Sequence, residues 1–107
     1  MRELKMKMNS KVVGSSFRGE LPWDQVEDGD ELRLVHEPEN KFDANAMGVW
    51  HVKTNTQFGY LPRETSDLLL NEIKATLFRC EVAEVTGGYG YKTAKGINIK
   101  INYDFEE

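Results

Sequence analysis

The most restrictive feature of this sequence is an alternation of apolar and polar residues with the period of a β-strand. It is clearest near the C-terminus, where apolar residues occupy every second position: Ile97, Ile99, Ile101 and Tyr103. Successive side chains of a strand point to opposite faces of a sheet, so this pattern gives the strand one apolar and one polar face. The segment 97–103 is therefore predicted to be a strand, and the fold is predicted to be built on a sheet.

Further segments with strand patterning follow one another through short connections. They lie at 3–17, as one strand or two nearly continuous ones, and at 31–37, 47–52, 57–61 and 78–86. The apolar parity of the segment 78–86 shifts near Ala83, which predicts a bulge. One main helix is predicted from Pro62 to about Ala75, because proline suits the first helical position. Connections this short argue against the crossovers of a parallel sheet, so the predicted fold is mainly β with one or two helices (α+β), a small antiparallel β-barrel of about six strands.

The length and composition predict one globular domain over residues 1–107. With 39% hydrophobic and 30% charged residues, the chain resembles an ordinary folded protein rather than a disordered one. The net charge of −4 argues against a strongly basic nucleic-acid coat but allows a local basic cleft. Cys80 is the only cysteine, and no apolar run approaches the ~20 residues of a membrane span. We expect an intracellular monomer, cytoplasmic in a bacterium or nuclear in a eukaryote.

A polar loop at 38–45 interrupts the strand pattern. Its Pro38 lacks a main-chain N–H, and its Asn and Asp side chains are of the kind that bond nearby main-chain groups in turns. We favour this bracing role for Asn40 and Asn45. For Asp43, capping of the loop and contact with a ligand remain equally open, because a carboxylate has an oxygen for each task. A rigid polar loop between apolar segments is a common place for a binding site.

Three blocks of this sequence together resemble the HIRAN domain family. They are Val12-Val13-Gly14, the Glu-Pro-x-Asn-x-Phe-Asp-x-Asn-Ala order of residues 37–46, and Gly59-Tyr60-Leu61-Pro62 at the entry to the predicted helix. The match in order and spacing covers residues 12 to about 75. The resemblance implies an OB-like barrel and a DNA-binding module, often fused to SWI/SNF-type helicases or to nucleases. It also implies capture of the 3′ end of single-stranded DNA, in DNA repair or replication-fork processing.

The resemblance also assigns roles to individual residues. Asp43 occupies the position whose carboxylate accepts a hydrogen bond from the terminal 3′ hydroxyl, and Phe17 and Phe42 occupy the aromatic positions that hold the terminal base. Where a family member has an arginine, this chain has Ser16, and Arg18 is predicted to replace it from the same strand face or to point to solvent. The full set of predicted DNA-binding residues is Phe17, Arg18, Lys41, Phe42, Asp43, Tyr60, Arg63, Tyr89, Tyr91 and Lys92.

Each of these residues also has a purely structural interpretation. The phenylalanines are candidates for the core, as aromatic residues of a small barrel usually are. The cations are candidates for solvated surface charges, and the glycines beside Tyr89 are candidates for a simple hairpin turn. The alternative function is a protein-interaction or regulatory module on the same barrel without DNA affinity. The negative net charge and the serine at position 16 favour that alternative.

The sequence offers little support for an enzyme. Its two histidines occur without a cysteine pair for zinc, and it has no Gly-x-x-x-x-Gly-Lys phosphate loop. The acidic pair Asp28 and Asp30 is typical of a solvated turn. We therefore expect no catalysis, no metal and no cofactor. The expected partners are 3′ ends of single-stranded DNA and a helicase or nuclease.

Overall fold

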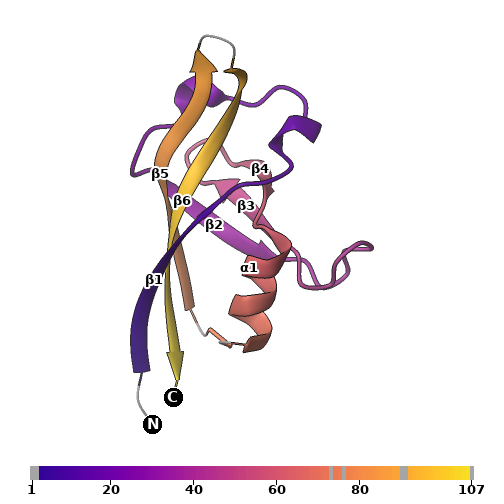
Figure 1. Ribbon diagram of the computed structural model, residues 1–107, viewed down its shortest axis with the longest axis vertical. Coiled ribbons are helices and arrows are strands. Elements are labelled where there is room, and N and C mark those ends of the chain that lie inside the picture. Colours follow the sequence, from indigo (N-terminus) through magenta and orange to yellow (C-terminus); the bar gives the residue numbers. More distant parts are fainter. Residues whose placement is uncertain (1–2, 73, 76, 90–91, 107) are drawn as a thin grey trace.

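The structure is a computed structural model that describes residues 3–72, 74–75, 77–89 and 92–106. It contains six strands: β1 (Glu3–Lys11), β2 (Glu31–His36), β3 (Met47–His51), β4 (Thr56–Tyr60), β5 (Leu77–Tyr89) and β6 (Lys92–Glu106). The helix α1 (Arg63–Asp67) continues into a π-helical turn, Leu68–Glu72, and 3-10 turns lie at Ser15–Phe17 and Trp23–Gln25. The predicted mainly-β class is confirmed (Figure 1).

All neighbouring strands are antiparallel and form one sheet in the order β1-β6-β5-β2-β3-β4. The strands β2 and β3 run across the direction of β5 and β6, so the sheet is strongly curved (Figure 1). The sheet is not closed into a continuous barrel, which corrects the predicted closure. An isolated bridge between Val13 and Tyr60 nevertheless ties the segment after β1 to β4.

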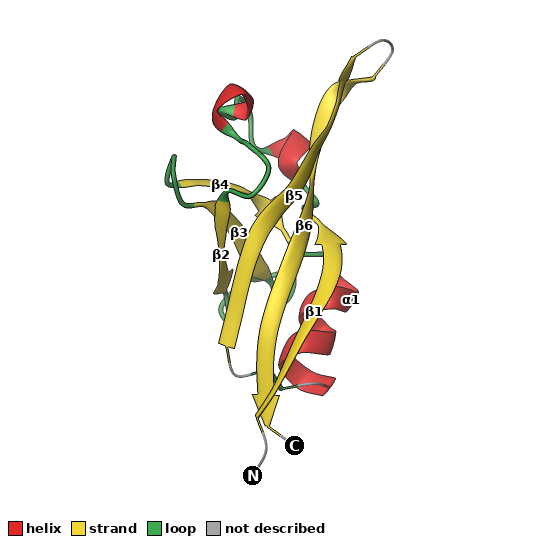
Figure 2. Cartoon of the chain, turned by 90° about the vertical axis from the view of Figure 1, so that its left-hand side faces the viewer, coloured by secondary structure: helices red, strands yellow, loops and turns green. Residues whose placement is uncertain are grey.

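The longest strand pair, β5 and β6, carries the clearest sequence signals. The alternating isoleucines Ile97, Ile99 and Ile101 are all buried, as their period predicts. The register with β6 shifts between Val82 and Glu84, which confirms the bulge predicted near Ala83. Both strands extend well beyond the predicted segments into a long hairpin (Figure 2).

The first predicted strand is too long. It ends at Lys11, and Gly14 adopts a left-handed conformation with φ 79° and ψ 6°. That conformation suits glycine and interrupts an extended chain, so a 3-10 turn follows. The segment from 15 to 17 is therefore a turn and not the end of a strand.

The start of the helix lies near the C-terminal end of β1, where Asn9, Ser10 and Lys11 share a cavity with Pro62, Glu64 and Thr65. Pro62 is the N-cap residue of the helix rather than its first helical residue, which is Arg63. The helical segment ends at Glu72, short of the predicted Ala75. Leu69 is fully buried and joins the core, which also includes Phe58. No helix in the described part of the chain is long and apolar enough to cross a membrane.

Candidate nucleic-acid interface

The loop at 37–46 is held in shape by its own side chains. Asn40 Oδ1 accepts the main-chain N–H of Phe42 at 2.9 Å and that of Asp43 at 3.1 Å. Its Nδ2 donates to Glu37 Oε1 at 3.1 Å, and the Glu37 N–H donates to the Ala46 carbonyl at 2.8 Å. The bracing role predicted for Asn40 is confirmed. The loop therefore presents Phe42 and Asp43 on a fixed main chain.

Asp43 has its two oxygens in different surroundings. Oδ1 accepts the main-chain N–H of Asn45 at 2.9 Å, which is the capping role. Oδ2 lies 3.7 Å from Nε of Arg63, the first residue of α1. The Asp43 side chain keeps 18% of its surface exposed and that of Arg63 keeps 77%. Capping thus uses one oxygen and leaves the other beside a solvent-exposed guanidinium.

A close main-chain approach brings the first and third motif blocks together. Val13 and Tyr60 exchange two hydrogen bonds, at 2.8 and 2.9 Å. A Cβ atom at Gly59 would collide with the Val13 carbonyl oxygen and would lie 2.8 Å from Cγ1 of Val12. Glycine at position 59 is therefore required by this contact, because no other residue lacks a Cβ atom.

A cavity of about 510 Å³ lies where the three motif blocks meet. Its lining residues are Val13, Asn40, Phe42, Asp43, Ala46, Tyr60, Leu61 and Arg63. The volume falls within the range of about 300–1,000 Å³ that is typical of small-ligand sites. Segments far apart in the sequence thus form one concave surface that offers an aromatic ring, a carboxylate and a guanidinium.

The two predicted stacking residues are both on the surface. Phe17 is 91% exposed and Phe42 is 90% exposed, so the interpretation of these rings as core residues is wrong. Phe42 lines the cavity, whereas Phe17 ends the 3-10 turn and is not among the cavity's lining residues. Both rings are therefore accessible to a ligand, Phe17 on the 3-10 turn and Phe42 on the braced loop.

The predicted cations differ in their relation to the cavity. Arg63 lines it, and Lys41 is exposed on the loop between Asn40 and Phe42. Arg18 Nη2 donates to Gln57 Oε1 at 3.2 Å, which ties the 3-10 turn to β4. Because that turn is not a strand, the prediction that Arg18 shares a strand face with its neighbour at position 16 is wrong.

Three predicted residues near the end of the β5–β6 hairpin cannot be assigned a place in the site. Tyr91 lies outside the described residues. Tyr89 and Lys92 are described only in their main chains, as the last residue of β5 and the first of β6. Their contact with DNA stays a prediction.

Glu37 braces the site, although it was not among the predicted site residues. Its Oε1 accepts hydrogen bonds from Asn40 Nδ2 and from the Tyr60 hydroxyl, both at 3.1 Å. It therefore links the braced loop to the strand that forms the opposite wall. Its place at the start of the Glu-Pro-x-Asn motif was a signal, but the partnership with Tyr60 depends on the pairing of distant strands.

A second polar cluster surrounds a histidine that is completely buried. His51 Nε2 lies 2.7 Å from Asp30 Oδ2, and its Nδ1 lies 2.7 Å from Thr54 Oγ1. Hydrogen bonds from His51 and from the Glu27 N–H lower the pKa of Asp30 below its usual value of 3.8. Asp30 thus fastens its turn to β3, so the interpretation of this residue as part of a solvated turn is wrong.

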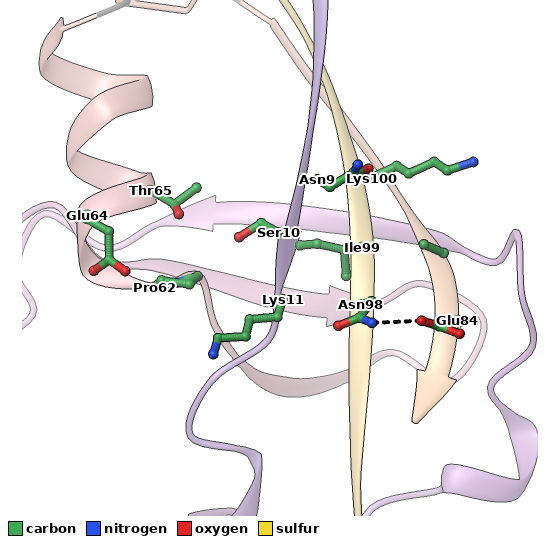
Figure 3. Close-up of a pocket in the computed structure, with 11 residues that line it drawn as sticks. Asn9, Ser10, Lys11, Pro62, Glu64, Thr65, Glu84, Asn98, Ile99 and Lys100 are labelled. Carbon is green, nitrogen blue, oxygen red and sulfur yellow. Dashed lines mark hydrogen bonds between the residues drawn. The ribbon is translucent and has the colours of Figure 1, made fainter. Parts of the chain in front are cut away.

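A different cavity, of about 660 Å³, lies between β1, β6 and the start of α1 (Figure 3). Its polar groups carry both signs of charge, including Lys11, Lys100 and Glu64, and Asn98 donates to Glu84 at 2.9 Å. None of the predicted DNA-binding residues lines this cavity. Within the described residues, no group of His, Cys, Asp and Glu side chains is arranged to hold a metal ion.

Comparison with known proteins identifies the origin of the three motif blocks. The sequence profile of the HIRAN domain matches residues 6–105. The chain belongs to the HIRAN family. Membership in the family supports a DNA-binding module, the class that the motif blocks predicted.

Two solved structures resemble this HIRAN domain along almost its whole length. The crystal structure of the HIRAN domain of human HLTF has a TM-score of 0.71 and 20% sequence identity, and the match covers 98% of this chain and 81% of that chain. The crystal structure of a protein from Lactobacillus plantarum has a TM-score of 0.65 and 17% identity, with 98% and 100% covered. No curated protein sequence matches significantly. At these identities the likeness shows the fold alone.

Proposed function

We propose that this HIRAN domain captures the 3′ end of single-stranded DNA, in the service of DNA repair or replication-fork processing. The observation that carries the proposal is the cavity of about 510 Å³ in which Phe42, Asp43 and Arg63 stand together. These three groups match the three parts of a strand end. An unpaired base has a flat face, the terminal sugar has a free hydroxyl, and the preceding linkage is a phosphate anion.

Asp43 supplies the selectivity for an end. Its Oδ1 is already used by the Asn45 N–H, whereas Oδ2 has a long 3.7 Å contact with Arg63. A carboxylate oxygen is an acceptor without a proton of its own, so it pairs with the O–H of a 3′ terminus. An internal nucleotide lacks that hydroxyl and would leave the acceptor unpaired.

Phe42 and Phe17 supply contact area that does not depend on base identity. Stacking of a base on an aromatic ring contributes about 1–3 kcal/mol. Phe42 would hold the terminal base at the cavity, and Phe17 would contact the strand from its turn beside β4. Arg63, Lys41 and Arg18 would contact phosphates, which makes the affinity fall as salt concentration rises.

The test is fluorescence-polarisation binding to single-stranded oligonucleotides with a free or a phosphorylated 3′ end, and to blunt duplexes. We expect the free single-stranded 3′ end to bind most tightly and Asp43→Ala to lose at least about 1 kcal/mol. The matched control is Asp28→Ala, which removes one acidic side chain from an exposed turn. Equal affinity for free and blocked ends would reject end capture.

The same measurements separate the alternative function. If no oligonucleotide binds even at low salt, the protein-interaction or regulatory module becomes the better explanation of this acidic domain. The proposed domain is a monomeric, intracellular, non-enzymatic unit that serves a helicase or nuclease. Incubation with labelled DNA and Mg²⁺ or Mn²⁺ tests the absence of catalysis, and cleavage would contradict it.

A further inference from the structure

The strands β2 and β5 separate after a very short pairing. Within the described residues they pair at Glu31–Glu81 and Leu32–Cys80, although β2 continues to His36. Beyond these pairs lies a cavity of about 620 Å³, here called the β2–β5 opening. Its lining residues are Glu31, Leu32, Arg33, Leu34, Phe78, Arg79 and Cys80. The strands diverge because β2 crosses the direction of β5 (Figure 1).

The hydrogen bonds of β2 show which main-chain groups face the opening. The Val52 N–H donates to the Glu31 carbonyl, and the Glu37 N–H donates to the Ala46 carbonyl. Both bonds are directed to the β3 side, so the odd-numbered residues of β2 turn their main-chain groups toward β3. Because these groups alternate along a strand, the N–H and C=O of Leu34 point toward β5.

The same alternation applies to β5. The Val82 N–H donates to the Asp30 carbonyl at 2.9 Å, so even-numbered residues here face β2. The main-chain groups of Phe78 therefore face the opening as well. The main-chain groups of Leu34 and Phe78 thus face each other across the opening without a β2–β5 pair between them. Strand edges of this kind are templates for an added strand.

The side chains give the opening an apolar floor and a charged rim, in which Glu31 contributes one carboxylate and Arg33 and Arg79 contribute two guanidinium groups. Leu34 and Phe78 are half-buried and pack against the core. Arg33 and Arg79 are exposed, and continuing the register of the last pairs would place them opposite each other on the outer face. Neither arginine forms an ion pair with another described residue. Arg33 and Arg79 both line the opening, so they bring two guanidinium groups to one cavity of a domain whose net charge is −4, and such groups attract anions.

We propose that the β2–β5 opening docks an extended acidic peptide segment of a partner protein by strand addition. The peptide main chain would pair with the edges at Leu34 and Phe78, and its apolar side chains would pack on the floor. Alternate carboxylates would pair with Arg33 and Arg79. Nucleic acid is a poorer occupant, because it has no peptide N–H and C=O groups to satisfy a strand edge. This docking surface is separate from the proposed DNA-end site and does not depend on it.

Amide hydrogen exchange in the free protein tests whether the edges are open. Leu34 and Phe78 are expected to exchange at least about tenfold faster than Arg33 and Val35, whose N–H groups point to β3. Equal protection of all four amides would show that the opening is closed in solution, and the proposal would be overturned.

Peptide binding tests the occupant directly. The probe is a short fluorescein-labelled peptide of alternating valine and glutamate, read by fluorescence polarisation. The double variant Arg33→Glu/Arg79→Glu is expected to weaken binding by about tenfold or more. The control Lys11→Glu/Lys100→Glu makes the same change of charge at the cavity of Figure 3 and is expected to have little effect.

Three further outcomes would overturn the proposal. The first is equal weakening by both double variants, which would show that only net charge matters. The second is retention of affinity by a peptide N-methylated at alternate residues, because that peptide cannot donate to a strand edge. If the arginine variant weakens oligonucleotide binding but not peptide binding, the opening belongs to a nucleic-acid path, and strand addition is rejected.

Discussion

Replacing Asp43 with asparagine should change which strand end the HIRAN domain prefers. The amide oxygen can still accept the Asn45 N–H, so the loop retains its shape. What is lost is the negative charge beside Arg63 and the charged acceptor for a 3′ hydroxyl. Asp43→Asn therefore separates the charge of the side chain from its structural role, which Asp43→Ala does not.

The size of the effect follows from the two interactions that change. A hydrogen bond to a charged group is worth about 1 kcal/mol more than a neutral one, so the free 3′ hydroxyl end should bind about fivefold more weakly. A 3′-phosphate is repelled by the native carboxylate, at about 4 kcal/mol for unit charges ~4 Å apart in an effective dielectric constant of ~20. Solvent and salt reduce this to about 1 kcal/mol at a partly exposed site, so the blocked end should bind about fivefold more tightly.

The assay is a competition between otherwise identical oligonucleotides with free and phosphorylated 3′ ends, followed by fluorescence polarisation at one salt concentration. The ratio of the two affinities should change by more than tenfold between the native domain and Asp43→Asn. An exposed-turn control, Asp28→Asn, removes the same charge and should leave the ratio unchanged. The reasoning is refuted if Asp43→Asn weakens both ends equally, because the carboxylate would then not read the end.

Three other predictions concern the fold. Gly59→Ala should destabilise the domain by about 1–3 kcal/mol in urea denaturation, because the new Cβ atom would press on the Val13 carbonyl oxygen. Unchanged stability would show that the bridge between Val13 and Tyr60 can shift. The lowered pKa of Asp30 contributes stability that is fully present above its unfolded-state value of 3.8 and is lost as pH falls through the folded-state pKa. Thermal unfolding between neutral and acidic pH should show this loss below about 3.8. Asp30→Asn should lower the stability at neutral pH and remove this part of its decrease at acidic pH. Burial raises the pKa of Cys80 to about 12 from 9.0, so its thiolate fraction near neutral pH is lower by about a thousandfold, and a disulfide reagent that modifies it at the rate of an exposed thiol would contradict the structure.

The strands could be predicted because their signal is local. Ile97, Ile99 and Ile101 alternate with polar residues, and a period of two defines both the strand and its buried face. The bulge near Ala83 was predictable for the same reason, since an extra residue shifts the apolar parity. These features need no knowledge of which strands become neighbours.

The errors arose where a local pattern competes with main-chain conformation. Met8 and Val12 continue the alternation of β1, but Gly14 adopts a left-handed conformation that ends the extended segment. Glycine occurs in both strands and turns, so the sequence could not show which applied at this position. The predicted place of Arg18 failed with it, because the argument from strand faces holds only within a strand.

The site itself was predictable only in part. The motif blocks named Phe42 and Asp43, and Arg63 was predicted from its place in the first turn of the helix; the structure places all three around one cavity. The link between Glu37 and the Tyr60 hydroxyl depends on how β3 and β4 pair, which no local pattern contains. Nor could the sequence show that β2 and β5 separate after two residue pairs, because both have ordinary strand patterns.

The exposure of two phenylalanine rings is the feature that folding energetics explains least. Burying a phenylalanine side chain stabilises a protein by about 1.5–3 kcal/mol, yet Phe17 and Phe42 keep 91% and 90% of their surface in water. Neither ring is exposed because its main chain is loose. The Phe42 N–H is held by Asn40, and the Phe17 N–H donates to the Gly14 carbonyl at 3.2 Å. Fixed main chains that hold flat apolar rings in solvent are expected where a flat partner supplies the missing contact, and an unpaired base is such a partner.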